Sequence, residues 1–258
     1  YAQQFTFRDP CVVGTAASLL GQGPRNRFDE VSRVEILLQG TGTLSGIDEA
    51  ALLNGANLAM LGEEVFQFQH TELISPNKYR LSRLLRGRLG TEHAIATHSL
   101  GERFILLDAR LQKDMMPDGL IGLPRQYKTV SVGRTLGVAT PYSFTYQARS
   151  LKPYSPVHVT DYRNEVGDLR ITWKRRTRIG GNWRDYSDVP LSEQEERYVL
   201  ELLDGEDILR SIEVTQPEYL YTSAQQLADF GVVPAPLSVR VMQLSARVGR
   251  GYPTMATV

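Results

Sequence analysis

"RLSRLLRGRLGTEHAIATHSLGERFILLD" (residues 80–108) contains the turn that decides how the first half of this chain folds. Apolar, strand-like runs enclose a centre that is rich in glycine. Gly87 and Gly90 permit tight backbone turns, and Thr91 can cap a short helix. Arg86 can donate to loop carbonyls from its rigid fork of N–H groups. We therefore predict that this stretch is a structural turn that closes a small β-sheet or barrel.

A metal site is the alternative to a structural turn, because the stretch contains two histidines and imidazoles bind metals. His93 and His98 are five residues apart. Metal-binding pairs on a helix are usually three or four apart, so that both side chains share a face. A separation of five turns the second imidazole roughly 140° away from the first. We therefore expect no metal site here.

Two carboxylate pairs are the remaining candidates for an enzyme of the cell envelope, such as a glycosidase. Glu92 with Glu102, and Glu195 with Glu196, are close in sequence, but only a cleft that brings a pair together would support hydrolysis. The chain has no phosphate-binding loop, nucleophile elbow or zinc-protease motif. The residues alone predict neither an enzyme nor a cofactor.

Composition narrows the class of protein. Lys plus Arg and Asp plus Glu balance at 29 each, which argues against a nucleic-acid partner, because such binders carry excess positive charge. No run has the length of a membrane span. Cys11 is the single cysteine, so no internal disulfide forms, and we expect it to be a small buried residue. Since the chain begins at Tyr1, in strand-like sequence, we interpret it as a piece of a longer polypeptide.

Short runs rich in β-branched and aromatic residues predict a mainly β fold. In the first half these runs are 33–40, 64–74, 78–87, 103–108, 126–134 and 142–148. A helix-forming run at 45–61 is interrupted by Gly55. Two prolines within "KPYSP" mark a boundary between Ser150 and Leu151. We predict a β-rich domain at 1–150 and a β-sandwich at 151–258.

The second half shows the periodicity of strands with one buried side. Leu169, Ile171 and Trp173 fall on one face of a run whose other face is polar. Two apolar runs at 198–214 flank Asp204-Gly205, which predicts a hairpin. "TSAQQLADFG" (222–231) predicts a short helix that ends at its glycine.

Two surface features of the second half suggest binding. The basic run "KRRTR" (174–178) could contact phosphates or an acidic glycan, although acidic residues nearby favour a solvated, partly charge-paired strand face. Aromatic residues that could stack on sugars are Trp183 and Tyr186, and also Tyr219 or Tyr221. Packing at the edge of the sandwich is the alternative explanation of these rings.

Two groups of motifs resemble known proteins. "GEEVFQFQHTELI" followed by the stretch at 80–108 resembles tail-tip proteins of long-tailed phages and gene transfer agents. Their signature is an acidic strand, Arg-Gly-x-x-Gly-Thr, His-x-x-Gly and a closing apolar strand. The matching residues are Glu64, Arg86, Gly87, Gly90, Thr91, His98 and Gly101. "GDLRITWKRRTRIGGNW", "YVLELLDG", "QQLADFG" and "QLSARVGRGYP" resemble the C-terminal part of the large tail hub protein, which is similar to a fibronectin type III module.

The resemblance implies a non-enzymatic role, because the family has no catalytic residues to carry over to these positions. It implies a component of the tail tip or hub, made in the bacterial cytoplasm and then built into a particle. The implied partners are other tail proteins, two further copies of the parent chain in a homotrimer, and a host surface polysaccharide or outer-membrane receptor. A carbohydrate-binding module attached to an envelope-degrading enzyme is the alternative.

Overall fold

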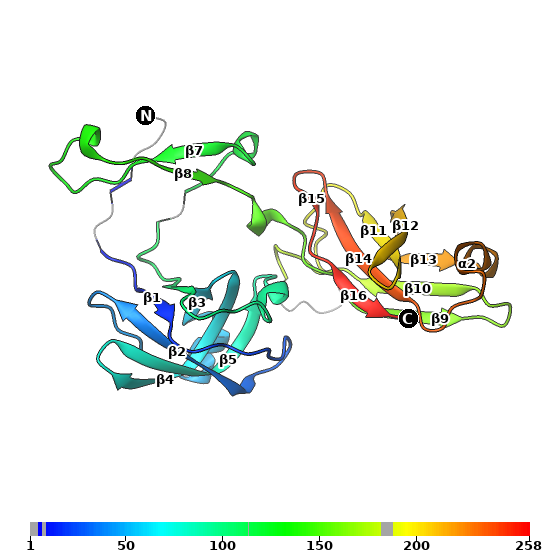
Figure 1. The fold of residues 1–258 in the computed structure, drawn as a ribbon, viewed down its shortest axis with the longest axis horizontal. Helices are drawn as coiled ribbons and strands as arrows, with labels where there is room; N and C mark the ends of the chain where they lie inside the picture. Colours follow the sequence, from blue (N-terminus) through cyan, green and yellow to red (C-terminus); the bar gives the residue numbers. More distant parts are fainter. Residues whose placement is uncertain (1–4, 7–8, 113, 182–187) are drawn as a thin grey trace. The chain divides into compact units, whose positions relative to one another are not determined.

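The structure is a computed structural model that describes residues 5–6, 9–112, 114–181 and 188–258 (Figure 1). Contacts between residues divide the chain into two units, Tyr1–Asp114 and Met115–Val258. This division differs from the predicted boundary between Ser150 and Leu151. The segment that precedes the predicted boundary is tied to the later part of the chain, because Arg247 Nε donates to Asp118 Oδ2 at 2.6 Å. No helix among the described residues has the length and apolar character needed to cross a membrane.

The first unit is a closed antiparallel barrel with the strand order β1-β2-β5-β4-β3-β6. The strands are β1 (Val13–Ala16), β2 (Asp29–Gln39), β3 (Leu58–Leu61), β4 (Glu64–Ser75), β5 (Lys78–Arg88) and β6 (Arg103–Leu106). The barrel closes where β1 pairs with β6, with Val13 opposite Ile105. The predicted strands at 33–40, 64–74, 78–87 and 103–108 all lie in this barrel.

Alternating apolar side chains fill the barrel, as a small barrel requires. Ile36, Phe66 and Phe104 are fully buried in one core. Gln67 alternates with the phenylalanines of β4 and is also buried, because its amide donates to the backbone oxygens of Leu52 and Ala56 at 2.6 and 2.9 Å. The outer face of β4 is therefore covered by the region of α1.

The short helix α1 (Glu49–Leu53) begins where Asp48 accepts from Ala51 N at 2.7 Å. It ends before Gly55, whose φ is +96°. The expected interruption by Gly55 is confirmed. The 3₁₀ turn η1 (Glu92–Ala94) lies in the segment that the sequence predicted to be helical, but Thr91 makes no side-chain cap there.

The second unit is mainly a fibronectin type III-like β-sandwich. One sheet has the order β13-β10-β9, and the other has β12-β11-β14-β15, with β16 also pairing with β14. The strands are β9 (Val157–Arg163), β10 (Leu169–Lys174), β11 (Tyr198–Asp204), β12 (Asp207–Val214), β13 (Glu218–Tyr221), β14 (Ser238–Ser245), β15 (Gly249–Arg250) and β16 (Thr254–Thr257). The helix α2 (Ser223–Phe230) begins with a Thr222–Gln225 capping box and ends at Gly231. The predicted hairpin and helix are confirmed.

The sandwich core contains the face that the sequence predicted. Leu169, Ile171 and Trp173 are buried on β10, and the Trp173 ring packs edge-on against Tyr198 of the opposite sheet at 5.3 Å between centroids. The two sheets therefore share one core.

A separate two-stranded sheet precedes the sandwich, built from β7 (Pro124–Tyr127) and β8 (Tyr142–Thr145). The predicted strand at 126–134 is wrong beyond Tyr127. The chain leaves the ladder there, Gly133 has a φ of +84°, and the 3₁₀ turn η3 (Leu136–Val138) follows. Two further 3₁₀ turns lie in this unit, η2 (Asp118–Leu120) and η4 (Arg149–Leu151).

Replacing Trp173 by Ala tests the sandwich core. We expect a loss of about 3–5 kcal/mol in the free energy of unfolding, because a fully buried ring leaves a cavity between the sheets. Hydrogen exchange of β10 and β11 amides would measure this loss. Tyr162→Ala is the matched control on β9, since that side chain is 69% exposed, and it should change stability by less than about 0.5 kcal/mol. Equal effects of the two variants would contradict the assigned core.

Candidate functional site

Five charged or titratable side chains meet at one end of the barrel. We call them the Arg86 network: Asp29, Glu64, Arg86, His98 and Glu102. Strand register places them together, because the start of β2 pairs with the end of β5, and the end of β5 pairs with the start of β4. The start of β6 reaches the same end, where Phe104 pairs with Leu61 at the end of β3. Residues far apart in sequence thus converge through antiparallel pairing.

Arg86 and Glu64 form the centre of the network, and both side chains are completely buried. Arg86 Nε and Nη2 each donate to one carboxylate oxygen of Glu64, both at 2.8 Å. This is the paired geometry in which an arginine–carboxylate contact is strongest. Two charges without solvent are costly unless every hydrogen-bonding position is filled.

The remaining donors of Arg86 are all used. Nη1 donates to the carbonyl of Gly21 at 3.0 Å and to Asp29 Oδ2 at 3.3 Å, and Nη2 also donates to the carbonyl of Ile95 at 3.2 Å. With the two bonds to Glu64, all five N–H groups of the guanidinium have partners. Arg86 thus joins β5 to the loops on both sides of the barrel end.

The carboxylate of Glu64 is equally saturated. Its Oε1 also accepts from the backbone N–H of Gly87 at 2.8 Å, and its Oε2 lies 2.6 Å from His98 Nε2. His98 Nδ1 lies 2.7 Å from Glu102 Oε2. Because each ring nitrogen faces a carboxylate, both act as donors in the charged imidazolium. His98 therefore bridges the core of the barrel to the chain that enters β6.

The pKa values follow from these contacts. Burial by itself would raise the pKa of Glu64, but hydrogen bonds from His98, Arg86 and Gly87 outweigh it and hold that pKa below its usual value. Burial by itself would lower the pKa of His98, but hydrogen bonds to Glu64 and Glu102 and their charges raise it above its usual value. Both shifts favour the ionised forms, the carboxylate of Glu64 and the imidazolium of His98.

Asp29 fixes the loop before the barrel end. Burial opposes its ionisation, but hydrogen bonds from Ser32 and Val31 and the charge of Arg86 give it a pKa below the usual value. Gly23 lies against this pair, and a Cβ there would be 2.3 Å from Asp29 Oδ2. Only glycine therefore leaves room for the Arg86–Asp29 contact.

The glycines and threonine of the motif shape the turn around the network. Gly87 has a φ of +59°, and a Cβ there would be 2.9 Å from the Cα of Glu92. Gly90 and Gly101 also have positive φ values. Thr91 Oγ1 accepts from Val65 N at 2.9 Å and donates to the carbonyl of Arg88 at 2.8 Å. Thr91 thus attaches the turn to β4, where the sequence had suggested a helix cap.

The arrangement is suited to holding the barrel end together. Arg86 and Glu64 have no free donor or acceptor position for a ligand, and the His98 side chain is only 2% exposed. Among the described residues, no group of three or more His, Cys, Asp or Glu side chains could hold a metal ion.

Of the other predicted candidates, Glu102 belongs to the network. Glu196 lies outside it and binds Arg175 and the Tyr198 hydroxyl. Glu195 is exposed. Trp183 and Tyr186 lie outside the described residues.

The tyrosines considered as sugar platforms are used within the sandwich. Tyr221 is fully buried, and its hydroxyl donates to Asp229. Tyr219 packs against the same core. The interpretation of Tyr221 as an exposed sugar platform is therefore wrong, because its ring belongs to the core.

The basic run is partly charge-paired, as one of its two interpretations predicted. Arg175 pairs with Asp188 and Glu196, and Arg178 pairs with Glu193. These carboxylates follow the run closely in sequence, so the charge is compensated locally.

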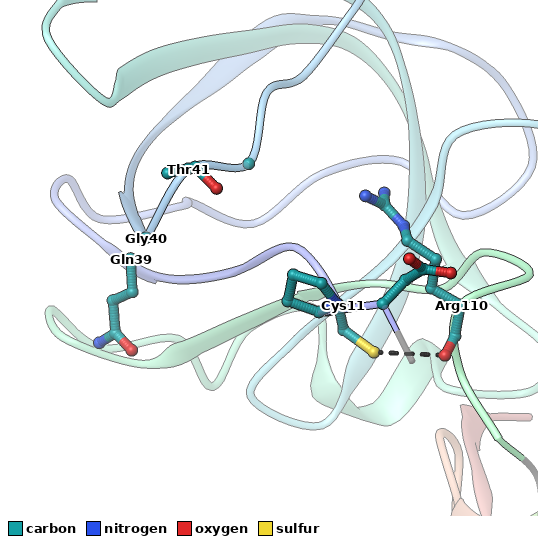
Figure 2. A pocket seen from close by; sticks show the side chains of 8 residues that line it. Cys11, Gln39, Gly40, Thr41 and Arg110 are labelled. Atoms are coloured by element: carbon teal, nitrogen blue, oxygen red, sulfur yellow. Dashed lines mark hydrogen bonds between the residues drawn. The ribbon is translucent and has the colours of Figure 1, made fainter. Parts of the chain in front are cut away.

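A surface pocket of about 400 Å³ lies at the opposite end of the barrel, where β1 begins and β2 ends. Figure 2 shows Cys11, whose Sγ lies 3.6 Å from the carbonyl oxygen of Arg110, beside the turn of Gln39, Gly40 and Thr41. Cys11 is half-buried, which corrects the expectation of a buried core residue.

Sequence reasoning identified four members of the network but missed Asp29, and it also missed Gly23, which lies against the Arg86–Asp29 pair. Asp29 and Gly23 were not singled out, because a lone aspartate before a strand and a lone glycine in a loop have many structural explanations. Their roles depend on Arg86, which is more than fifty residues away in sequence. Only the joint occurrence of Gly23, Asp29 and Arg86 in related sequences could have indicated that these residues are in contact.

Comparison with known proteins gives one family match. Residues 11–105, which contain β1 to β5 and all but the last residue of β6, match the model of the family described as Rcc01698-like, C-terminal. No curated protein matches the chain.

Several solved structures are similar to the chain at low identity. The rat CD45 extracellular region, domains d3-d4, has 13% identity and a TM-score of 0.31 over 59% of this chain and 71% of that one. The chicken CNTN1 FN1-FN3 domains have 12% identity and a TM-score of 0.30 over 94% and 66%. Domains A168-A170 of titin have 10% identity and a TM-score of 0.30 over 96% and 65%.

Replacing Arg86 by Ala tests the structural interpretation of the network. We expect a loss of about 3–5 kcal/mol in the stability of the barrel, because Glu64 and Asp29 would stay buried without their cation. Hydrogen exchange of β4 and β5 amides would measure it. Arg80→Ala is the control on the same strand. Its side chain is 37% exposed and pairs with Glu35 and Glu72, so the loss should stay below about 1 kcal/mol. An unchanged barrel in the Arg86 variant would refute the interpretation.

The pH dependence of barrel stability tests His98. The pKa of His98 is raised in the folded state, so the charged imidazole contributes to the stability of the barrel. This contribution is complete below the unfolded pKa of about 6.5 and is lost as the pH rises through the folded pKa. Glu64 acts oppositely, and its contribution is lost as the pH falls through its lowered folded value. We expect the alkaline loss to disappear in His98→Gln. The free energy of opening from hydrogen exchange, corrected for intrinsic rates, should be compared from pH 6 upward in both proteins. An alkaline loss of equal size in the variant would exclude His98 as its source.

Proposed function

We propose that the chain is a non-enzymatic structural component of a phage-like tail tip or hub, in a phage or a gene transfer agent. In this proposal it contributes to tail assembly and to attachment at the host envelope. The parent protein is made in the bacterial cytoplasm, assembles as a homotrimer with other tail proteins, and becomes part of the tail tip.

The observation that carries the proposal is the saturated Arg86 network. The residues that resemble the tail-tip signature, from Glu64 to Gly101, are those that close the barrel end. Because Glu64 and Arg86 are buried and fully hydrogen-bonded, the signature is explained by architecture without a reaction. A closed barrel also leaves no free strand edge, which suits a module packed among other subunits.

The match of residues 11–105 to one family model agrees in extent with this barrel, so the signature and the fold belong to the same segment. A fibronectin type III-like sandwich attached to it supplies a second rigid module.

The proposal is tested on particles from the cells that encode the chain. An antibody raised against residues 1–258 should label purified particles at one tail end in electron micrographs, and crosslinked particles should give a trimer of the parent chain. Antibody pre-adsorbed with the purified chain is the control for specific labelling. Absence of the chain from purified particles, or label on the head alone, would reject the proposal.

A further inference from the structure

The hairpin of β7 and β8 carries an exposed aromatic surface that the proposed function leaves unexplained. Its two strands form a sheet of their own (Figure 1). Arg125 lies opposite Phe144, and Tyr127 lies opposite Tyr142. Directly opposed residues, and residues two apart on one strand, share a face. These four side chains therefore lie on one face, which we call the aromatic face.

The rings of the aromatic face contact one another and remain open to solvent. Tyr127 stacks on Tyr142 at 5.5 Å between centroids, with 25° between the planes, and meets Phe144 edge-on at 6.2 Å. Tyr142 is 53% exposed and Phe144 is 51% exposed. The opposite face carries small or polar side chains, including Gln126 and Ser143. The hairpin is therefore amphipathic, with its apolar side uncovered.

The sequence around this face carries positive charges without negative ones. The chain as a whole is neutral, yet it has no Asp or Glu from Gly119 to Thr160. Basic residues in that interval are Arg125, Lys128, Arg134, Arg149 and Lys152. Lys128 donates to the carbonyl of Leu136, whereas no carboxylate of the described residues pairs with Arg125. An occupant of the aromatic face therefore meets an uncompensated guanidinium.

We propose that the aromatic face binds an acidic polysaccharide, with sugar rings on Tyr142 and Phe144 and a sugar carboxylate or sulfate on Arg125. The C–H groups of a sugar ring are attracted to the negative faces of aromatic rings. The planar guanidinium of Arg125 can bind an acidic group through two parallel hydrogen bonds. This inference rests on the proposed function, since it names the envelope component that the tail protein would contact.

The observations favour this occupant over two others. A second copy docked through the same face would bring two Arg125 side chains together, which is unfavourable without an intervening carboxylate. Single-stranded nucleic acid carries one phosphate per nucleotide and is bound along a basic groove. The aromatic face presents one cation beside three rings, which matches a polymer whose charges are spaced by neutral sugars.

Binding of the purified chain to hyaluronate and to kappa-carrageenan is the direct test, because their carboxylates or sulfates alternate with neutral sugars; neutral dextran and oligo-dT are the comparison polymers. Calorimetry should show saturable binding to one of the acidic polymers, and weaker or no binding to dextran and oligo-dT. Phe144→Ala and Tyr142→Leu should each weaken that binding about tenfold, since each ring supplies a stacking contact. Arg125→Gln should weaken it and reduce its salt dependence.

Ser143→Ala and Gln126→Ala are the matched controls on the opposite face, and both should bind like the parent chain. Circular dichroism of all five variants checks that the fold is retained, and Arg125→Gln keeps every ring in place if a ring variant unfolds the hairpin. Failure to bind either acidic polymer, tighter binding to oligo-dT, or equal losses from both faces would each overturn the inference.

The polysaccharide-binding experiment and the particle-labelling experiment can fail independently of each other. Antibody labelling of particles does not depend on glycan binding, so particles labelled at the tail with no polysaccharide bound would overturn this inference alone. Polysaccharide binding by a chain absent from particles would reject the tail assignment and leave the site on the hairpin.

Discussion

The buried pair of Arg86 and Glu64 is the interaction on which the first unit depends. A small barrel filled by aliphatic and aromatic side chains has no intrinsic reason to contain a guanidinium. Here the guanidinium of Arg86 hydrogen-bonds to Glu64 on β4 and to the loop carbonyls of Gly21 and Ile95, so it holds these loops against the end of the barrel. Breaking such a pair on one side leaves a charge without solvent or partner, so the network acts as a single unit.

The second unit also contains a buried carboxylate, that of Glu201, but its charge is compensated in a different way. Glu201 lies on β11 with 1% of its side chain exposed, and Arg240 and Arg250 bind it at 2.5 and 2.7 Å. Both arginines are themselves partly exposed, so solvent stabilises the cations while the carboxylate is shielded. In the barrel, by contrast, both members of the central pair are enclosed. Because Glu201 has two cationic partners, loss of either arginine would still leave it paired with the other.

Local patterns predicted much of this fold because local physics governs those elements. The period-two run around Trp173, the hairpin at Asp204-Gly205 and the capped helix α2 each depend on residues adjacent in sequence. The strand expected beyond Tyr127 does not form, because β-branched composition does not supply a pairing partner. Asp29 and Gly23 could not be found, since their roles arise from a contact with β5 that only the closed barrel creates. The expectation that Tyr221 could be a sugar platform failed for a similar reason, because composition does not tell an exposed ring from a core ring.

The pairing of β1 with β6 has a consequence for how the chain is made. It joins Val13 to Ile105, so nearly the whole first unit must leave the ribosome before the barrel can close. Contacts of such long sequence separation form slowly, because loop closure costs entropy before they form. Until then β1 and β6 have unpaired edges, which are templates for aggregation. The nascent chain therefore passes through a vulnerable interval that lasts at least as long as the translation of the residues between β1 and β6.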